Sequence, residues 1–226
     1  MTPYVPVAIA HRIQLGISLI EMAIVLMIIS FLATTVLSEL STYKTQHRIV
    51  TTQAQLETIK QALIGFALLE SRLPCADLNQ DGQEELDCQA EGFLPWANLA
   101  LQGKDAWGRP FRYRVAKAFT EPAKIHSLTA ESRLNIFDHQ QGYWLSNKTP
   151  DTRVAAVIFS CGANGRPEAD NDADGLNNPD ILCYNPGDAN NTYNHSVYIR
   201  GEFDDILSWL SKNLLFQRLI QAGQYS

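Results

Sequence analysis

A nearly uncharged apolar run close to the N-terminus constrains this chain more than any other feature. Between Ile17 and Leu37 the only charged residue is Glu21, and the run contains neither proline nor glycine. An apolar run of about 20 residues is long enough to cross a bilayer as a helix. A carboxylate within such a span costs roughly 2.5–3.5 kcal/mol on insertion scales, so Glu21 is expected to have a specific role.

Cleavage of the chain after Gly16 would provide Glu21 with an ionic partner. Ile17 would then carry a free ammonium group four residues before the carboxylate. The Glu21 of one subunit could neutralise the new amino terminus of a neighbouring subunit, because opposite charges attract strongly where water is excluded. This pairing gives a physical reason for a single charge inside an apolar run.

The same residues resemble a known processing signal. The stretch from Gly16 to Met22 is similar to the cleavage site of type IV prepilins and of the pseudopilins of type II secretion. The resemblance implies that a prepilin peptidase cuts after Gly16 and methylates Ile17, and that Glu21 guides subunits into a helical filament. Ile17 departs from the commoner phenylalanine, but both side chains are large and apolar. The segment Lys104–Val115 is also similar to part of the pseudopilin domain, with Ala106 in place of a proline.

Two other interpretations of the N-terminus are a plain single-span anchor with an incidental glutamate and a cleaved secretory signal peptide. The second is disfavoured because the apolar run exceeds a usual h-region and no A-x-A-like site follows it closely. Arg12 precedes the run and most acidic residues follow it. By the positive-inside rule, the leader would face the cytoplasm and the domain would be exported.

Length and charge narrow the class of protein further. The 226 residues can hold one membrane helix and one compact domain. The formal net charge of -6 argues against a nucleic-acid-binding domain, which would be basic. In agreement with this length and charge, the resemblance to prepilins implies a single-pass protein of the bacterial inner membrane with a periplasmic domain, which would later enter a pilus or pseudopilus and, in a pilus, reach the cell surface.

The expected export of the domain bears on the state of the four cysteines. In an oxidising compartment, four cysteines are expected to form two disulfides, for which three pairings exist. We favour Cys75–Cys88 and Cys161–Cys183, because each of these pairs brackets an acidic loop. Free buried thiols are the alternative.

Both bracketed loops alternate oxygen-bearing side chains with other residues. The residues are Asp77, Asn79, Asp81 and Glu85 in the first loop, and Asp170, Asp172, Asp174, Asn177 and Asp180 in the second. This alternation resembles the first half of a calcium loop, and the major pseudopilins use calcium in their C-terminal loops. The twelfth positions are Cys88 and Ile181, so neither loop is an EF-hand, and a calcium site would need further ligands. The alternative is a solvated surface in which Asp, Asn and Gly simply favour turns.

The patterns predict an α+β fold, which the resemblance implies is pilin-like. A long helix should run from Ile17 to about Glu70, with an assembly half at 17–38 and an amphipathic half at 39–72, followed by a globular domain at 73–226. A small antiparallel sheet should pack on this helix, beside the long loops that the disulfides bracket. The expected strands are Phe111–Val115, Arg153–Phe159 and Val197–Ile199, and a last helix is expected at Ile206–Ala222.

The sequence also predicts where two tryptophans and three arginines lie in the fold. Trp96 and Trp107 are expected in the core under the helix. Arg109, Arg112 and Arg114 are expected on a solvated strand face.

Taken together, these features predict a structural protein that performs no catalysis. The chain lacks Gly-x-Ser-x-Gly, His-Glu-x-x-His and a phosphate-binding glycine loop. The resemblance to prepilins and pseudopilins implies a minor subunit of a type IV pilus or of a type II secretion pseudopilus. Its partners would be the prepilin peptidase, other pilins or pseudopilins and the inner-membrane assembly platform, and nucleic acid is not expected. The alternative is a minor pilin that acts as a calcium-dependent binding or adhesion module. An enzyme anchored by the same helix is a more distant third.

Overall fold

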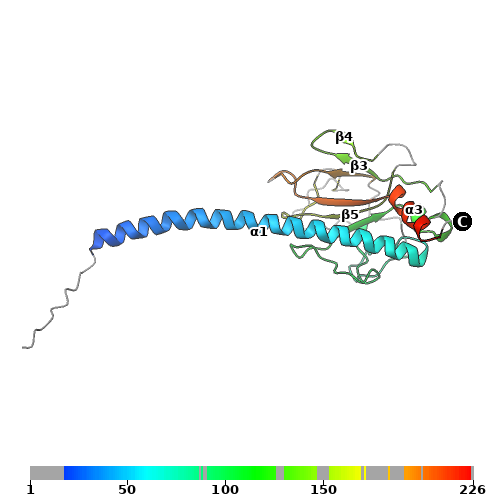
Figure 1. The fold of residues 1–226 in the computed structure, drawn as a ribbon, viewed down its shortest axis with the longest axis horizontal. Coiled ribbons are helices and arrows are strands. Elements are labelled where there is room, and N and C mark those ends of the chain that lie inside the picture. The colour runs from blue at the N-terminus through cyan, green and yellow to red at the C-terminus, as the bar shows by residue number, and fades with distance from the viewer. Residues whose placement is uncertain are drawn as a thin grey trace, which may run out of the picture. The chain divides into compact units, whose positions relative to one another are not determined.

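The chain forms an α+β fold, which Figure 1 shows as a ribbon. The computed structural model describes residues 18–86, 88, 91–125, 130–146, 153–168, 171, 183, 191–199 and 201–224, without the side chains of residues 33–41 and Ala123. The chain divides into two compact units, Met1–Lys44 and Thr45–Ser226.

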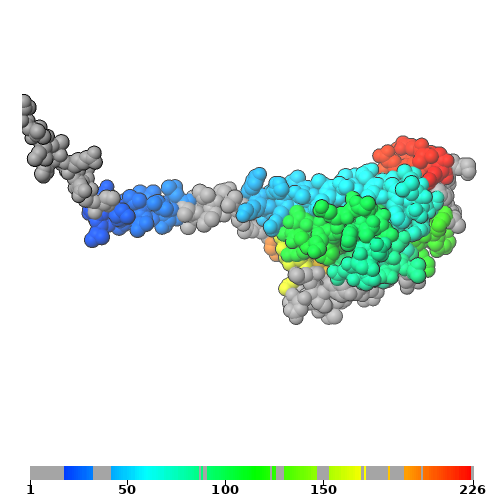
Figure 2. Space-filling view, turned by 90° about the horizontal axis from the view of Figure 1, so that it is seen from below, coloured from blue at the N-terminus to red at the C-terminus, as the bar shows by residue number. Residues whose placement is uncertain are grey.

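Helix α1 (Leu19–Glu70) confirms the long N-terminal helix expected from the sequence. In the second unit its buried residues recur at steps of three and four, as an amphipathic helix requires. These residues are Ile49, Thr52, Leu56, Ile59, Leu63, Ile64 and Ala67. Leu69 is 85% exposed, so the buried stripe ends at Ala67. In the space-filling view this part of α1 (cyan) lies directly against the segments that follow it (green) (Figure 2).

The transmembrane helix expected at residues 17–38 was not found. In the part of the chain that the structure describes, no helix is both long enough and apolar enough to span a bilayer. Ile17 and the side chains of residues 33–38 lie outside the described residues.

The first sheet contains four antiparallel strands in the order β1-β2-β5-β7. The strands are β1 (Gly92–Phe93), β2 (Arg112–Val115), β5 (Val154–Ser160) and β7 (Ile206–Ser211). β2 and β5 confirm two strands expected from the sequence. Every residue of β5 is buried, because β5 lies between two other strands and joins the same core as the buried face of α1.

A second sheet contains β4 (Tyr143–Trp144), β3 (Asn135–Asp138) and β6 (Thr192–His195). β3 pairs with β4 antiparallel and with β6 parallel. The expectation that Val197–Ile199 would pair beside the strand at residues 153–159 was wrong. β2 and β7 occupy both edges of β5, and Ile199 forms only an isolated bridge with Phe203.

The helix expected at Ile206–Ala222 was half right. Its first six residues form β7, and helix α3 (Lys212–Gln221) follows directly. Ser211 caps α3, because its hydroxyl oxygen accepts a hydrogen bond from the Leu214 amide at 3.2 Å. A short apolar run fits a strand and a helix equally well by its pattern alone. The open edge of β5 decides in favour of the strand. Two short helices, η1 (Lys117–Phe119) and α2 (Pro122–Ile125), follow β2.

The expected solvated arginine face on β2 was wrong. Arg112 is 1% exposed and Arg114 is also buried, because β2 is an inner strand that is covered on both faces. Arg109 is half-buried, and its guanidinium donates hydrogen bonds to the carbonyl oxygens of Gly162 and Ala163. Of the two expected core tryptophans, Trp107 is partly buried against the core, whereas Trp96 is 38% exposed.

Candidate functional site

Glu21 lies in the first turn of α1 and is exposed. The turn is formed, since the Met22 amide donates a hydrogen bond to the carbonyl oxygen of Ser18 at 3.1 Å. A carboxylate at this end of a helix is stabilised by the helix dipole. Gly16 and Ile17, the expected cleavage and methylation positions, lie outside the described residues.

Large apolar side chains are exposed along the first part of α1. They are Leu19, Ile20, Met22, Ile24, Val25, Leu26, Met27, Ile28, Ile29, Phe31 and Leu32. These positions follow one another too closely to lie on a single helix face. A helix that is apolar on every side normally contacts another molecule or a core, because such a surface is costly to leave in water. This part of α1 is therefore a candidate interaction surface.

The first acidic loop is closed by hydrogen bonds from its own backbone. Asp77 is fully buried, and its two carboxylate oxygens accept from the amides of Asn79 (3.0 Å), Gln80 (2.7 Å) and Gly82 (2.7 Å). The Asn79 side chain accepts from the Asp81 amide and donates to the Glu85 carboxylate. These are the turn-forming roles of Asp and Asn. The expected calcium site in this loop stays a prediction.

The second acidic loop lies between Cys161 and Cys183. Its five candidate calcium ligands, Asp170, Asp172, Asp174, Asn177 and Asp180, lie outside the described residues.

The structure brings together a different set of carboxylates. Glu168, Asp204 and Asp205 each place an oxygen within 4.8 Å of the others, and this is the one described group of three or more possible ligands that is so compact. Glu168 follows β5, whereas the two aspartates immediately precede β7. The antiparallel pairing of Ser160 with Ile206 brings these two segments together.

Backbone amides hold the three carboxylates in place. The amides of Asp204 and Asp205 both donate to Glu168 Oε2 at 2.9 Å, and the Glu168 amide donates to Asp205 Oδ2 at 2.8 Å. The Asn164 amide donates to Asp204 Oδ2 at 2.7 Å. The cluster is thus fixed by the main chain on both sides.

Burial and the proximity of like charges make the ionised forms of these three carboxyl groups unfavourable. Burial raises the pKa of Glu168 to about 7, and the neighbouring Asp204 carboxylate adds to this shift. Burial also raises the pKa of Asp204, and it raises that of Asp205 well above the usual range. Like charges held close together in a poorly solvated place favour either a bound proton or a bound cation.

No local sequence pattern points to this cluster. Asp204 and Asp205 directly precede the helix that was expected at Ile206–Ala222, and Glu168 lies in the loop that Cys161 and Cys183 bracket. Their sequence separation of 36 and 37 residues becomes a short distance only through the pairing of β5 with β7. In the sequence, the one indication of this cluster is the pair of adjacent aspartates, Asp204 and Asp205.

The disulfides agree with the favoured pairing. Cys75 is bonded to Cys88 and Cys161 to Cys183, with Cα–Cα distances of 4.8 and 5.9 Å. All four cysteines are therefore used, and free thiols are excluded. Because Glu168 lies between Cys161 and Cys183, the second disulfide closes the loop that carries it.

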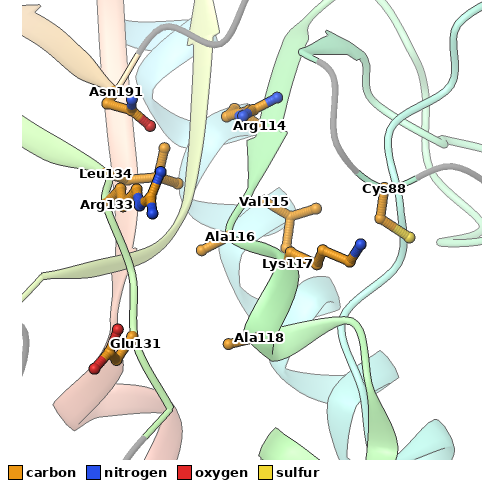
Figure 3. A pocket seen from close by; sticks show the side chains of 10 residues that line it. All are labelled: Cys88, Arg114, Val115, Ala116, Lys117, Ala118, Glu131, Arg133, Leu134 and Asn191. Carbon is orange, nitrogen blue, oxygen red and sulfur yellow. The ribbon is translucent and has the colours of Figure 1, made fainter.

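A separate groove lies between β2 and the segment that precedes β3. Figure 3 shows Glu131 and Arg133 on one side and the chain from Arg114 to Ala118 on the other. The groove has a volume of about 320 Å³. Its described lining includes three cationic side chains and one carboxylate, and its one cysteine, Cys88, is disulfide-bonded. This lining offers no nucleophile paired with a base, as covalent catalysis would require.

Comparison of the chain with family models, with curated proteins and with solved structures returned no match. The likeness to prepilins and pseudopilins accordingly rests on the residues quoted above from the sequence.

Proposed function

We propose that this chain is a structural subunit of a pilus-like filament, either a type IV pilus or a type II secretion pseudopilus. The observation that carries the proposal is the exposed apolar surface of α1 between Leu19 and Leu32, which surrounds Glu21 and begins shortly after the proposed cleavage point at Gly16. In a filament, equivalent helices of neighbouring subunits would cover this surface. The role is structural, and the chain is the substrate of a peptidase rather than an enzyme.

Burial of this surface would supply the energy of assembly. Fully burying one large apolar side chain contributes roughly 1.5–3 kcal/mol. Eleven such side chains are exposed between Leu19 and Leu32, so even partial burial outweighs the entropy lost when subunits associate. Apolar contacts are not directional, however, and do not fix the register between helices.

Glu21 would supply the missing register. Cleavage after Gly16 would leave an ammonium group on Ile17, and the Glu21 carboxylate of the adjacent subunit could bind it. A charge pair in an apolar interface strongly disfavours any register that leaves one charge alone. The proposed partners are therefore the prepilin peptidase, further pilin-like subunits and the assembly platform at the inner membrane.

We expect Glu21→Gln to leave cleavage intact and to reduce incorporation into filaments by at least tenfold. Glutamine keeps the size of the side chain but cannot neutralise the amino terminus. Cleavage is measured by intact mass and N-terminal sequencing of the protein from its own cells, where the mature chain should begin with N-methylated Ile17. Incorporation is measured as the fraction of subunit in sheared filaments.

The matched control is Glu70→Gln, which removes an exposed carboxylate at the other end of the same helix. It should assemble normally. Normal assembly of Glu21→Gln would reject the register argument, and a chain that still begins at Met1 would reject the prepilin pathway itself.

A further inference from the structure

We propose that a pocket beside Trp96 binds a small organic anion with an aromatic ring, of which an aromatic carboxylate is the simplest form. Its lining comes from the first acidic loop, from β1 and from the segment between β1 and β2. The inference goes beyond the proposed function and does not depend on filament assembly.

The pocket has the size and the lining of a small-molecule site. Its volume is about 440 Å³, and sites for small molecules measure about 300–1,000 Å³ and are mostly apolar. A protein partner would instead need a contact area on the order of 1,000 Å². The apolar side chains of the lining are Phe93, Leu94, Trp96, Leu101 and Pro110.

Trp96 gives the pocket a rigid aromatic wall. Its side chain is 38% exposed, yet its amide donates to the Leu94 carbonyl oxygen at 2.8 Å and its carbonyl oxygen accepts from the Leu101 amide at 2.9 Å. Gly82 and Gly103 press on the indole, because a Cβ added at either position would lie within 3.0 Å of three indole atoms. An exposed ring that is already held in place can stack on a flat ligand with little loss of conformational entropy.

The indole has no aromatic or cationic partner in the part of the chain that the structure describes. None of the ring pairs there includes Trp96, and none of the cations over a ring lies above it. Its exposed face is therefore available to a ligand.

The charge that the pocket offers to a ligand is positive. Asp77 belongs to the lining, but both of its carboxylate oxygens already accept backbone amides of the acidic loop. Lys104 is exposed and takes part in none of the ion pairs among the described residues. A ligand with one negative charge would supply the missing partner of Lys104.

The lining favours an aromatic anion over a sugar. A pyranose ring can stack on an indole, but each hydroxyl group on its edge loses water when it is buried and needs a new partner. The uncharged polar side chains of the lining are Gln80 and Gln102, and the five apolar ones offer no hydrogen bonds. An aromatic ring has no hydroxyl groups to satisfy, and its carboxylate can pair with Lys104.

The test is isothermal titration of phenylacetate into the full chain in detergent, with protein-free detergent as the blank. The wild-type chain should bind one phenylacetate with a Kd on the order of 10⁻³ M or tighter. It should bind the neutral phenylacetamide and the sugar acid glucuronate at least fivefold more weakly.

Two variants separate the charge from the ring. Lys104→Met should weaken phenylacetate binding at least fivefold and leave phenylacetamide binding unchanged, which a general folding defect would not do. Trp96→Leu should weaken the binding of both ligands at least tenfold, and circular dichroism checks its fold. If Trp96→Leu does not fold, Lys104→Met decides, since that side chain is exposed.

The matched controls are Lys117→Met and Trp144→Leu. Lys117 is an exposed lysine in the groove of Figure 3, and Trp144 is 37% exposed on β4. Neither residue lines the pocket beside Trp96. Both variants should bind phenylacetate as the wild type does.

Absence of binding at millimolar phenylacetate would overturn the inference, as would wild-type affinity in Lys104→Met or in a folded Trp96→Leu. Weaker binding in Lys117→Met alone would place the anion in the groove of Figure 3 and overturn the inference as well. Tighter binding of glucuronate than of phenylacetate would contradict the choice of an aromatic ligand. A chain that assembles into filaments and binds no phenylacetate would overturn this inference and leave the proposed function standing.

Discussion

Replacement of Arg112 by methionine is expected to destabilise the folded domain by about 3–5 kcal/mol. Arg112 is 1% exposed, and its guanidinium forms an ion pair with Glu91, which is fully buried. Tyr193, also fully buried, donates its hydroxyl to the second oxygen of Glu91. Methionine fills much of the same volume but leaves the Glu91 carboxylate without its cation in a dry environment.

The network also joins parts of the fold that are distant in sequence. Arg112 lies on β2, Tyr193 lies on β6, and Arg112 donates a second hydrogen bond to the carbonyl oxygen of Cys183 at 2.6 Å. Loss of the guanidinium therefore removes a hydrogen bond to a disulfide-bonded segment as well as the ion pair with Glu91. Burial raises the pKa of Glu91, and the charge of Arg112 opposes this rise. In Arg112→Met the carboxyl group is therefore driven further towards its protonated form.

Urea unfolding at pH 8 measures this loss. The double variant Arg112→Met with Glu91→Gln should be less destabilised than Arg112→Met alone, because it removes the unpaired charge while Tyr193 keeps an acceptor. The control Lys124→Met breaks an exposed ion pair with Glu121 and should cost no more than about 1 kcal/mol. If Arg112→Met were as mild as this control, the ion pair would not support the domain.

The parts of the fold that the sequence could predict are those that follow from local patterns. α1 is a long run without breakers, and its stripe of buried residues repeats with the helical period. β5 is a short, continuous apolar run of the kind that forms a buried strand. The disulfides were predictable because each pair brackets one distinct loop.

The predictions from sequence were wrong where tertiary contacts decide the secondary structure or the burial of a residue. Ile206–Ser211 suits a helix by composition, yet it forms β7 because β5 offers an edge there. From the sequence alone, Arg112 is expected at the surface. In the structure it is paired with Glu91, which also accepts a hydrogen bond from Tyr193. No periodicity in the sequence reports either of these long-range contacts.

The candidate sites also differ in whether a local sequence pattern reveals them. Glu21 could be singled out because one charge in an apolar run is a local anomaly. Glu168, Asp204 and Asp205 could not be found together, because their proximity depends on the register between β5 and β7. The alternating acidic loops attracted attention instead, although turn formation accounts for the hydrogen bonds of the first one.

Replacement of Gly162 by alanine is expected to destabilise the domain by about 3 kcal/mol. Gly162 has φ +49°, in the left-handed region that favours glycine. An added Cβ would lie 2.0 Å from the carbonyl oxygen of Asp204 and 2.6 Å from its carbonyl carbon. Both atoms belong to the backbone, so relief of the clash must move the segment that carries Asp204 and Asp205.

The matched control is Gly142→Ala. Gly142 also has a positive φ, +71°, but an added Cβ would meet nothing within 4 Å. Its variant should show only the conformational cost of about 1–2 kcal/mol. Thermal unfolding of both variants separates this conformational cost from the additional clash in Gly162→Ala. Equal stability of the two variants would contradict the close approach of Gly162 to Asp204. A larger loss of stability in Gly162→Ala would show that the packing of β5 against β7 depends on this close approach, because Gly162 follows β5 and Asp204 precedes β7.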